Sequence, residues 1–261
     1  MILKEVIFMK NKKIYDFHTH IADLETIEKY YESNVIPVIN CQNADEFKKI
    51  NKMFETIKNN RSFEEIRPFM SIGIHPHDSW KYEKDISDVY EEIIKKVPLV
   101  GEVGMDGCWC DVSFDIQEKV FRESLNLAKK YNKAVILHTK SMEKRIYEII
   151  KDYDLDFIVH WYSCKDYIKE FIDKGCYFTV GPAILIDENI RSLVKRAPID
   201  RLLLETDGIE ALEWLFKKDY RAEDIRRSLE VVCEEISLLK NMSKEEMFQN
   251  LQKNSERLLK I

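Results

Sequence analysis

The sequence alternates between short apolar runs and longer amphipathic stretches, and this alternation constrains the fold more than any other feature. Runs such as Val35–Ile39 and Ala134–Leu137 are apolar on both faces, which is typical of parallel strands covered by helices. We predict strands at eight runs: Ile14–Phe17, Val35–Ile39, Phe69–Ile74, Leu99–Glu102, Ala134–Leu137, Phe157–Val159, Tyr177–Val180 and Leu202–Leu204.

Amphipathic stretches with helical spacing follow these runs, and Gly175 stands where a helix C-cap glycine is expected. The predicted helices are Leu24–Tyr31, Ala44–Asn59, Ile86–Lys96, Phe114–Tyr131, Met142–Asp152, Lys165–Lys174, Glu188–Lys195, Arg221–Lys240 and Lys244–Leu259.

Eight strand–helix repeats in 261 residues match the size of an α/β fold of the TIM type. We therefore predict a single (β/α)8 TIM-like barrel with extra C-terminal helices, forming one domain over residues 1–261. An open doubly wound sheet is the competing fold, but its first strand usually leads into a glycine-rich phosphate loop. Here the first strand ends in His18-Thr19-His20 instead.

Composition narrows the class of protein. With 45% hydrophobic and 34% charged residues the chain is not globally disordered, and a net charge of −6 argues against a broad basic surface that grips nucleic acid. A nucleic-acid substrate stays possible, because bound divalent cations add positive charge that the sequence count omits.

The same features predict where the protein is found. The apolar run Val6–Met9 is too short for a membrane span, and we expect it to form a first edge strand. The six cysteines lack disulfide-like spacing and are typical of reduced cytosolic thiols. We expect a cytoplasmic protein with no membrane partner and no obligate protein partner.

All six histidines fall at or just beyond the C-terminal end of a predicted strand, the end where barrels of this kind build their active sites. A single core histidine is usually structural, but six at one end indicate a site, since imidazole is the commonest nitrogen ligand of transition metals. These histidines are His18, His20, His75, His77, His138 and His160.

Four of these imidazoles and two carboxylates form a candidate metal set. His18 and His20 are two residues apart, so both side chains point to the same side of their strand. Glu102 follows an apolar run, and Asp207 follows the last strand. The full predicted ligand set is His18, His20, Glu102, His138, His160 and Asp207.

Six ligands exceed one tetrahedral site and suit two divalent ions that share a bridging carboxylate. We assign Glu102 as the bridge, the first-strand histidines to one ion, and His138 and His160 to the other. Asp207 is expected to ligate the first ion and to accept a proton from the attacking water. Mixed imidazole and carboxylate ligands suit Zn²⁺, Mn²⁺ or Fe²⁺, and also Mg²⁺.

These residues resemble the TatD family of metal-dependent hydrolases, within the amidohydrolase-like barrels. The motifs that carry the resemblance span most of the chain: Asp16-x-His18-x-His20, Gly73-x-His75-Pro76-His77, Gly101-Glu102-x-Gly104-x-Asp106, Gln117-x-x-x-Phe121, His138, His160 and Glu205-Thr-Asp207. The resemblance implies a TIM-like barrel, a divalent-metal site from the residues just assigned, and hydrolysis of phosphodiesters or related esters.

The resemblance also implies roles for two further histidines and a lysine. His75 is expected to contact substrate phosphate, whereas His77 is expected to order its loop through a structural hydrogen bond. Lys140 stands where the family usually has Arg, so it keeps the positive charge but loses bidentate phosphate geometry. The chain departs from the family pattern on four loops of the expected substrate pocket: Gly107–Trp109, Lys140, Trp161–Cys164 and Gly208–Glu210.

Three functions follow. The first is a two-metal phosphodiesterase, most simply a deoxyribonuclease acting as a 3′–5′ exonuclease on a transiently bound nucleic acid. The alternative is a hydrolase of carboxylic esters or amides, such as a deacylase of aminoacyl-tRNA, and the loop departures motivate it. A metal-binding protein without turnover is disfavoured, because binding alone does not need a base such as Asp207. Trp109 and Trp161 are either stacking faces for a base or packed loop anchors.

Overall fold

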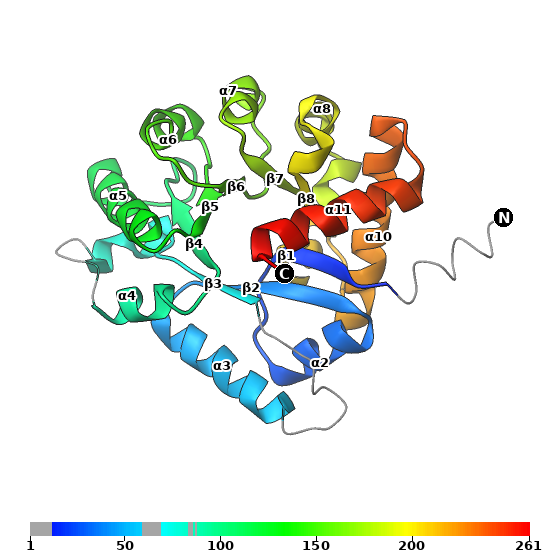
Figure 1. Cartoon of the computed structure of the whole chain (residues 1–261), viewed down its shortest axis with the longest axis horizontal. Coiled ribbons are helices and arrows are strands. Elements are labelled where there is room, and N and C mark those ends of the chain that lie inside the picture. Colours follow the sequence, from blue (N-terminus) through cyan, green and yellow to red (C-terminus); the bar gives the residue numbers. More distant parts are fainter. Residues whose placement is uncertain (1–11, 59–68, 83–85, 87) are drawn as a thin grey trace. The chain divides into compact units, whose positions relative to one another are not determined.

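A computed structural model describes residues 12–58, 69–82, 86 and 88–261 of the chain. Strands and helices alternate along these residues, as Figure 1 shows. The strands are β1 (Ile14–Thr19), β2 (Val35–Cys41), β3 (Phe69–Ile72), β4 (Leu99–Gly104), β5 (Ala134–His138), β6 (Phe157–Val159), β7 (Tyr177–Val180) and β8 (Leu202–Leu204). The predicted edge strand at Val6–Met9 and the end of the helix predicted to reach Asn59 lie outside the described residues.

The helices follow the strands in the predicted order. They are α2 (Leu24–Glu32), α3 (Ala44–Lys58), α4 (Asp88–Ile94), α5 (Phe114–Lys130), α6 (Glu143–Ile150), α7 (Ile168–Asp173), α8 (Glu188–Arg196), α9 (Ile209–Phe216), α10 (Ala222–Lys240) and α11 (Lys244–Leu259). Three 3-10 helices join them: η2 (Pro76–Tyr82), η3 (Pro182–Leu185) and η4 (Ile199–Arg201).

The eight strands form one sheet in the order β1 to β8, so strands that are consecutive in the sequence are neighbours. The pairings of β1 with β2 and of β3 through β7 are parallel. Parallel strands in sequence order, alternating with helices, are the architecture of a TIM-like barrel. The predicted fold class, including the extra C-terminal helices, is confirmed.

The described residues fall into two compact units. The first comprises residues 12–39, 53–58 and 179–261, and the second comprises residues 40–52 and the described part of 69–178. The first unit therefore holds β1 and β8, and the second holds β3 through β6. That residues 1–261 form a single domain stays a prediction.

In the second unit, α5 packs on β4 and β5 because its apolar residues fall on one face of the helix. Val120, Phe121 and Leu125 are buried on that face, while the lysines of the last turn are exposed. β4 is buried along its whole length and β5 from its second residue on, with Val100 and Leu137 fully inaccessible. Apolar burial on this scale is the main favourable contribution to folding, at about 25 cal/mol per Å².

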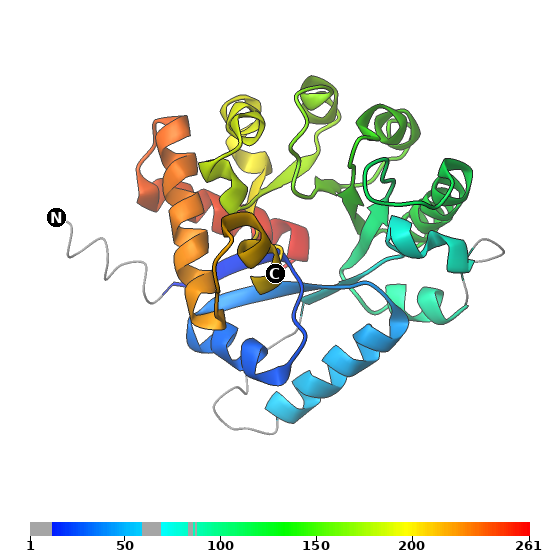
Figure 2. The ribbon, with the colours of Figure 1, turned by 180° about the vertical axis from the view of Figure 1, so that it is seen from behind.

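In the first unit, the two C-terminal helices pack on each other, and α11 also packs on β1 and β8. Ser243 caps α11 by accepting a hydrogen bond from the backbone N–H of Glu246 at 3.2 Å. Figure 2 shows the preceding short helix α9 in dark gold, joined by a loop to α10 in orange. We did not predict α9 from the sequence, because Ile209–Phe216 is apolar apart from Glu210 and Glu213 and so lacks a clear separation of polar and apolar faces.

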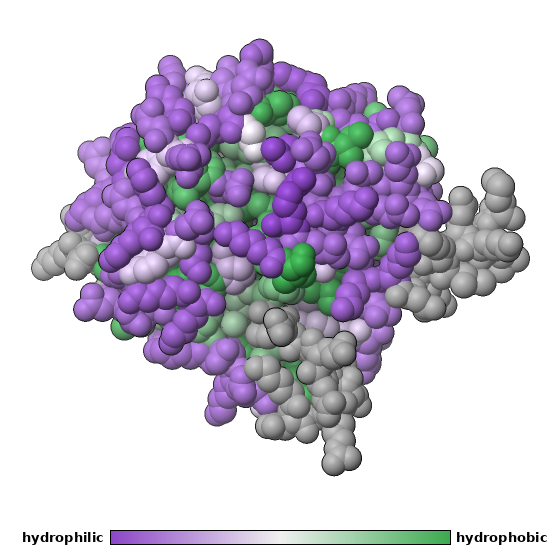
Figure 3. Space-filling view, in the orientation of Figure 1, coloured by the Kyte–Doolittle hydropathy of each residue, from purple (hydrophilic) through white to green (hydrophobic). Residues whose placement is uncertain are grey.

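The outward helix faces are charged, and hydrophilic side chains dominate the face that Figure 3 shows. Among the described helices, none combines the length and the apolar character that crossing a membrane requires.

Candidate metal centre

The first unit brings together His18, His20 and Asp207 at the ends of β1 and β8. The Nε2 atoms of His18 and His20 lie 3.4 Å and 3.5 Å from Oδ1 of Asp207. One ligand atom from each of the three residues lies within 4.8 Å of the others. The two histidines thus point to the same side of their strand, as their spacing predicts. His18 is fully buried, whereas 29% of the His20 side chain is exposed.

The backbone after β8 holds Asp207 in this position. Asp207 adopts a left-handed conformation with a φ of 62°, and its N–H donates to the carbonyl of His18 at 3.0 Å. Gly208 follows with a φ of 92°, and a Cβ there would lie 2.8 Å from the carbonyl oxygen of His20. Only glycine fits this approach, so the loop after β8 lies directly against the end of β1.

Asp16 of β1 connects this strand to the loop that follows β8. Its Oδ1 accepts from the backbone N–H of Thr206 at 2.8 Å, and its Oδ2 accepts from the hydroxyls of Thr206 at 2.5 Å and Tyr30 at 3.2 Å. Complete burial raises the pKa of Asp16 to about 8, although the Thr206 hydrogen bonds oppose this shift. The sequence motif contains Asp16 but gives it no role by itself. Its spacing of two residues from His18 is the signal that could have found it.

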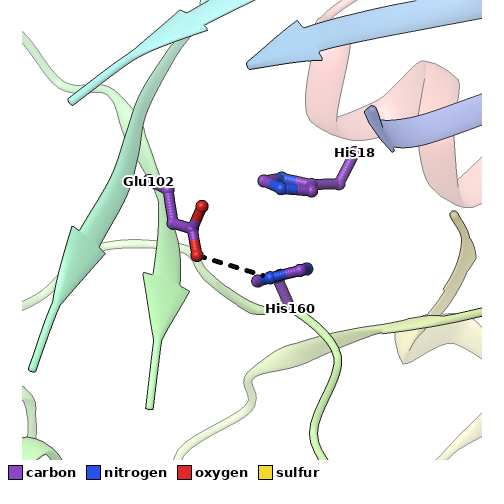
Figure 4. Close-up of side chains that lie close together, drawn as sticks. All are labelled: His18, Glu102 and His160. Carbon is purple, nitrogen blue, oxygen red and sulfur yellow. Dashed lines mark ion pairs between the residues drawn. The ribbon is translucent and has the colours of Figure 1, made fainter. Parts of the chain in front are cut away.

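The second unit gathers three histidines around Glu102, whose side chain is 5% exposed. Oε1 of Glu102 lies 2.6 Å from Nδ1 of His138 and 3.9 Å from Nε2 of His75. Figure 4 marks the third contact, an ion pair of 3.3 Å between Glu102 and Nε2 of His160. The predicted ligands Glu102, His138 and His160 therefore meet, and His75 joins them as a further candidate ligand.

Electrostatics of this cluster follow from burial and close pairing. Burial acts to raise the pKa of Glu102, but His160 and His138 together outweigh it and hold the pKa well below its usual range. Burial acts to lower the pKa of His138, but hydrogen bonds to Asp106 and Glu102 raise it above its ordinary value. For His75 burial dominates and lowers the pKa to about 4. His75 is thus a neutral imidazole near pH 7.

Asp106 is a functional residue that sequence reasoning missed, because the motif alone assigns no role to this side chain. Its Oδ2 lies 2.7 Å from Nε2 of His138, on the opposite side of the ring from Glu102. Its backbone N–H donates to Oε1 of Gln117 at 2.8 Å, and Nε2 of Gln117 donates to the Asp106 carbonyl at 3.1 Å. Helix α5 thereby fixes the backbone of Asp106, whose carboxylate contacts His138. A carboxylate behind a ligand histidine is the usual device for fixing its tautomer.

The remaining predicted residues lie on neighbouring loops of the second unit. The ring of His77 stacks on that of His75 with centroids 5.0 Å apart, and the His77 N–H donates to Nδ1 of His75 at 3.2 Å. Lys140 donates from Nζ to the carbonyl of Trp161 at 2.9 Å. That His75 and Lys140 bind substrate stays a prediction.

The donors in both clusters are imidazole nitrogens and carboxylate oxygens. This donor chemistry fits a divalent ion such as Zn²⁺ or Mn²⁺ better than a soft, thiolate-seeking metal. His18 and His20 with Asp207 supply three donors, and Glu102 with its histidines supplies the others. The residues present therefore fit bound metal at each cluster.

Comparison with known proteins decides the family. A protein-family model described as TatD-related DNase matches residues 15–260. The chain belongs to this family. The resemblance inferred from the sequence motifs is confirmed, and the protein is a metal-dependent hydrolase of the TatD family.

Two similar proteins match this chain over nearly its whole length, and a third matches about half of it. An uncharacterized metal-dependent hydrolase of Methanocaldococcus jannaschii is 26% identical, and the match covers 97% of this chain and 99% of the relative. The crystal structure of YjjV, a TatD homolog from Escherichia coli, superimposes with a TM-score of 0.76 at 24% identity, covering 95% of this chain and 98% of that one. The 3′–5′ ssDNA/RNA exonuclease TatD of Citrobacter koseri is 25% identical over 52% of this chain and 56% of its own length.

Proposed function

We propose that the protein is a phosphodiesterase that uses two divalent metal ions and removes nucleotides from the 3′ end of single-stranded DNA or RNA. The observation that carries this proposal is the pair of histidine–carboxylate clusters, one around Asp207 and one around Glu102. The name of the Citrobacter koseri relative, a 3′–5′ exonuclease, supports the choice of substrate.

Each cluster receives one ion in this proposal. His18, His20 and Asp207 would hold the first ion, and Glu102, His138 and His160 would hold the second. Bound divalent ions supply positive charge that activates a water nucleophile and stabilises the developing charge on the phosphoryl oxygens. Zn²⁺, Mn²⁺ and Mg²⁺ are the candidate ions.

The side chains contribute positioning and proton transfer. Asp207 has 23% of its side chain exposed, so its carboxylate can reach the attacking water and accept the proton. His75 is neutral, and because its Nδ1 accepts from the His77 N–H, its Nε2–H can donate one hydrogen bond to a phosphate oxygen. Lys140 adds a positive charge for the anionic substrate.

A turnover assay tests the proposal. A short single-stranded DNA labelled at its 5′ end is incubated with the protein and with Mg²⁺, Mn²⁺ or Zn²⁺ in turn. We expect a ladder of products shortened from the 3′ end, and a loss of at least about 100-fold in rate for Asp207→Asn and for His18→Ala, since each removes a ligand.

Asp219→Asn, a change at an exposed aspartate on another loop, is the matched control and keeps the wild-type rate. Intact DNA and RNA with every metal, from protein shown to carry metal, would refute the nuclease.

A second candidate is hydrolysis of a carboxylic ester or amide. The observation that favours it is the set of loops around Trp109 and Trp161, which depart from the family pattern beside the Glu102 cluster. The same metal-activated chemistry serves a carboxylic ester. A panel of aminoacyl esters, lactones and cyclic amides separates the two, because a phosphodiesterase leaves this panel intact.

A further inference from the structure

Three loops of the second unit place two tryptophans around one lysine. Trp109 follows β4, Lys140 follows β5 and Trp161 follows β6. Nζ of Lys140 lies 5.7 Å from the ring centroid of Trp109 and 5.9 Å from that of Trp161. We call these three residues the tryptophan–lysine platform. Both distances are within the range of a cation–π interaction.

Lys140 is held in place by more than its two aromatic neighbours. Its Nζ also donates to the carbonyl of Trp161 at 2.9 Å, and its own carbonyl accepts from the N–H of Gly107 at 2.8 Å. An unrestrained lysine side chain would lose rotamer entropy when it is ordered. Here that ordering already exists before any ligand arrives, so the platform is preorganised.

The loop of Trp109 is fixed at its backbone while its indole stays accessible. Oδ1 of Asp106 accepts from the N–H groups of both Cys108 and Trp109 at 2.7 Å, and Sγ of Cys108 lies 2.8 Å from Oγ of Ser141. A tryptophan that served as a loop anchor would bury its ring. Trp109 is instead 60% exposed, so its backbone is anchored and its ring face is available for stacking.

The platform adjoins the Glu102 cluster through direct links. Trp161 follows His160 in the chain, and their rings lie edge to face with centroids 6.4 Å apart. Asp106 connects the Trp109 loop to Nε2 of His138 at 2.7 Å. A planar ring that stacked on the platform would therefore lie next to the residues that are proposed to hold the second ion.

A groove beside Lys140 offers room for a small molecule next to the platform. Its volume is about 450 Å³, and Ser141, Met142, Arg145, Cys164 and Tyr167 are among the residues that line it. This volume is within the range of small-ligand sites. The charged residues that line the groove are the cations Lys144 and Arg145 and the carboxylates Glu143, Glu148 and Asp166. The groove therefore gives space beside Lys140 but no excess of positive charge, so Lys140 is the cation on which the inference depends.

We infer that the tryptophan–lysine platform binds the terminal nucleobase of a single-stranded nucleic acid and so positions the adjoining phosphodiester at the metal cluster. This inference rests on the proposed phosphodiesterase function and specifies how that site selects its substrate. Indole faces stack on any base, so the platform prefers an unpaired base without selecting its sequence. A base in a duplex is already stacked on its neighbours and is a poorer ligand.

Binding of two oligonucleotides tests the platform. The probes are a labelled five-residue oligothymidylate and the same strand with an abasic residue at its 3′ end. Dissociation constants are measured by fluorescence anisotropy in the presence of metal with the Asp207→Asn protein, which retains every candidate ligand of the Glu102 cluster and is expected to cleave the strands at least about 100-fold more slowly than the wild type. We expect the complete strand to bind about 10- to 100-fold more tightly than the abasic strand.

Variants of that protein assign the preference to a residue. Trp109→Ala is expected to abolish the difference between the two strands, and Trp109→Phe is expected to keep part of it. Trp214→Ala is the matched control, because Trp214 is also 60% exposed but lies on α9, and it leaves the difference unchanged. Undiminished preference for the complete strand in Trp109→Ala would overturn the inference, as would equal binding of the two strands by the parent protein.

Failure of the platform and failure of the proposed function give different results. If wild-type protein shortens both strands at equal rates and Trp109→Ala does not change them, the phosphodiesterase stands and the platform is wrong. If wild-type protein cleaves neither strand but Trp109→Ala still removes a preference for the terminal base, the platform stands and the nuclease is wrong.

Discussion

His138 has a carboxylate on each of its ring nitrogens, Glu102 on Nδ1 and Asp106 on Nε2. In this arrangement one carboxylate can share a metal ion with the ring while the other holds the ring in orientation. Because Asp106 is in turn fixed by Gln117, the orientation of His138 depends on the start of helix α5 as well as on its own strand. Asp106 thus acts as a positioning residue.

At the residue scale, we expect Asp106→Asn to weaken binding of the second metal ion about 10- to 100-fold, since a partner behind a ligand histidine typically contributes this much. Titration calorimetry with Zn²⁺ measures the affinity, and circular dichroism checks that the fold is retained. Asp111→Asn is the control, because Asp111 is an exposed aspartate of the same loop and its loss changes neither quantity. Unaltered zinc affinity in Asp106→Asn would show that the orientation of His138 does not depend on this carboxylate.

Several elements differ from the predicted bounds at their ends: the helices α4, α6 and α7 are shorter than predicted, and β3 ends two residues earlier, at Ile72. β6, β7 and β8 have the predicted bounds, whereas β5 continues one residue and β1, β2 and β4 each continue two residues beyond the predicted end. The added residues include polar ones, such as His18 and Thr19 in β1, and both are fully buried. Sequence patterns end a strand where the apolar run ends, but here hydrogen bonds and ligand clusters keep polar residues inside.

Two glycines provide a matched test at the element scale. Gly104 has a φ of 151°, and a Cβ there would lie 2.0 Å from the carbonyl oxygen of His138 on the neighbouring strand β5. Gly175 has a φ of 84°, and a Cβ there would meet nothing within 4 Å. We expect Gly175→Ala to lower the free energy of unfolding by about 1 kcal/mol, from backbone strain alone. Gly104→Ala should cost roughly 3 kcal/mol or more, since it adds a clash between strand backbones. Urea unfolding measures both, and equal costs would contradict the close approach of β4 to β5.

At the scale of the whole molecule, the chain has a net charge of −6, and part of its negative charge lies on the buried or half-buried carboxylates of the two ligand clusters. Divalent ions that bind the folded chain and not the unfolded one stabilise it by mass action. The size of this stabilisation depends on pH, because a protonated imidazole cannot bind a metal.

The raised pKa of His138 fixes the direction of that pH dependence. In chelator-treated protein the folded state holds the His138 proton more tightly than the unfolded state does. Protonation of His138 therefore stabilises the fold fully below the pKa that His138 has in the unfolded chain. This stabilisation is lost as the pH rises through the raised pKa that His138 has in the folded chain. Metal competes with the same proton, so stabilisation by metal has the opposite sign and grows as the pH rises.

We therefore expect Zn²⁺ or Mn²⁺ to raise the melting temperature, and by more at pH 8 than at pH 6. At about 100 times the dissociation constant, the ion contributes about 2.7 kcal/mol. Calorimetric scans with metal and with chelator at both pH values measure the effect, and Glu102→Gln should remove most of it. A shift that is larger at pH 6 would contradict the assignment of His138 as a metal ligand.

Much of the fold and the candidate metal ligands could be predicted from the sequence alone. The strands, most helices and the barrel follow from local periodicity, because an apolar pattern reports which faces are buried whatever packs against them. The candidate ligands could also be found from the sequence, since histidines such as His138 and His160 directly follow or end apolar strands, and that they bind metal stays a prediction.

Only the tertiary structure decided which side chains pair across the chain. It placed Asp106 behind His138, joined Asp16 to Thr206 from 190 residues away, and left Trp109 exposed while its backbone is held. These features depend on hydrogen bonds between distant segments and on backbone conformations such as that of Asp207, which no local pattern encodes. Periodicity determines which faces are buried, but the partners of a polar side chain are chosen by the fold that brings them together.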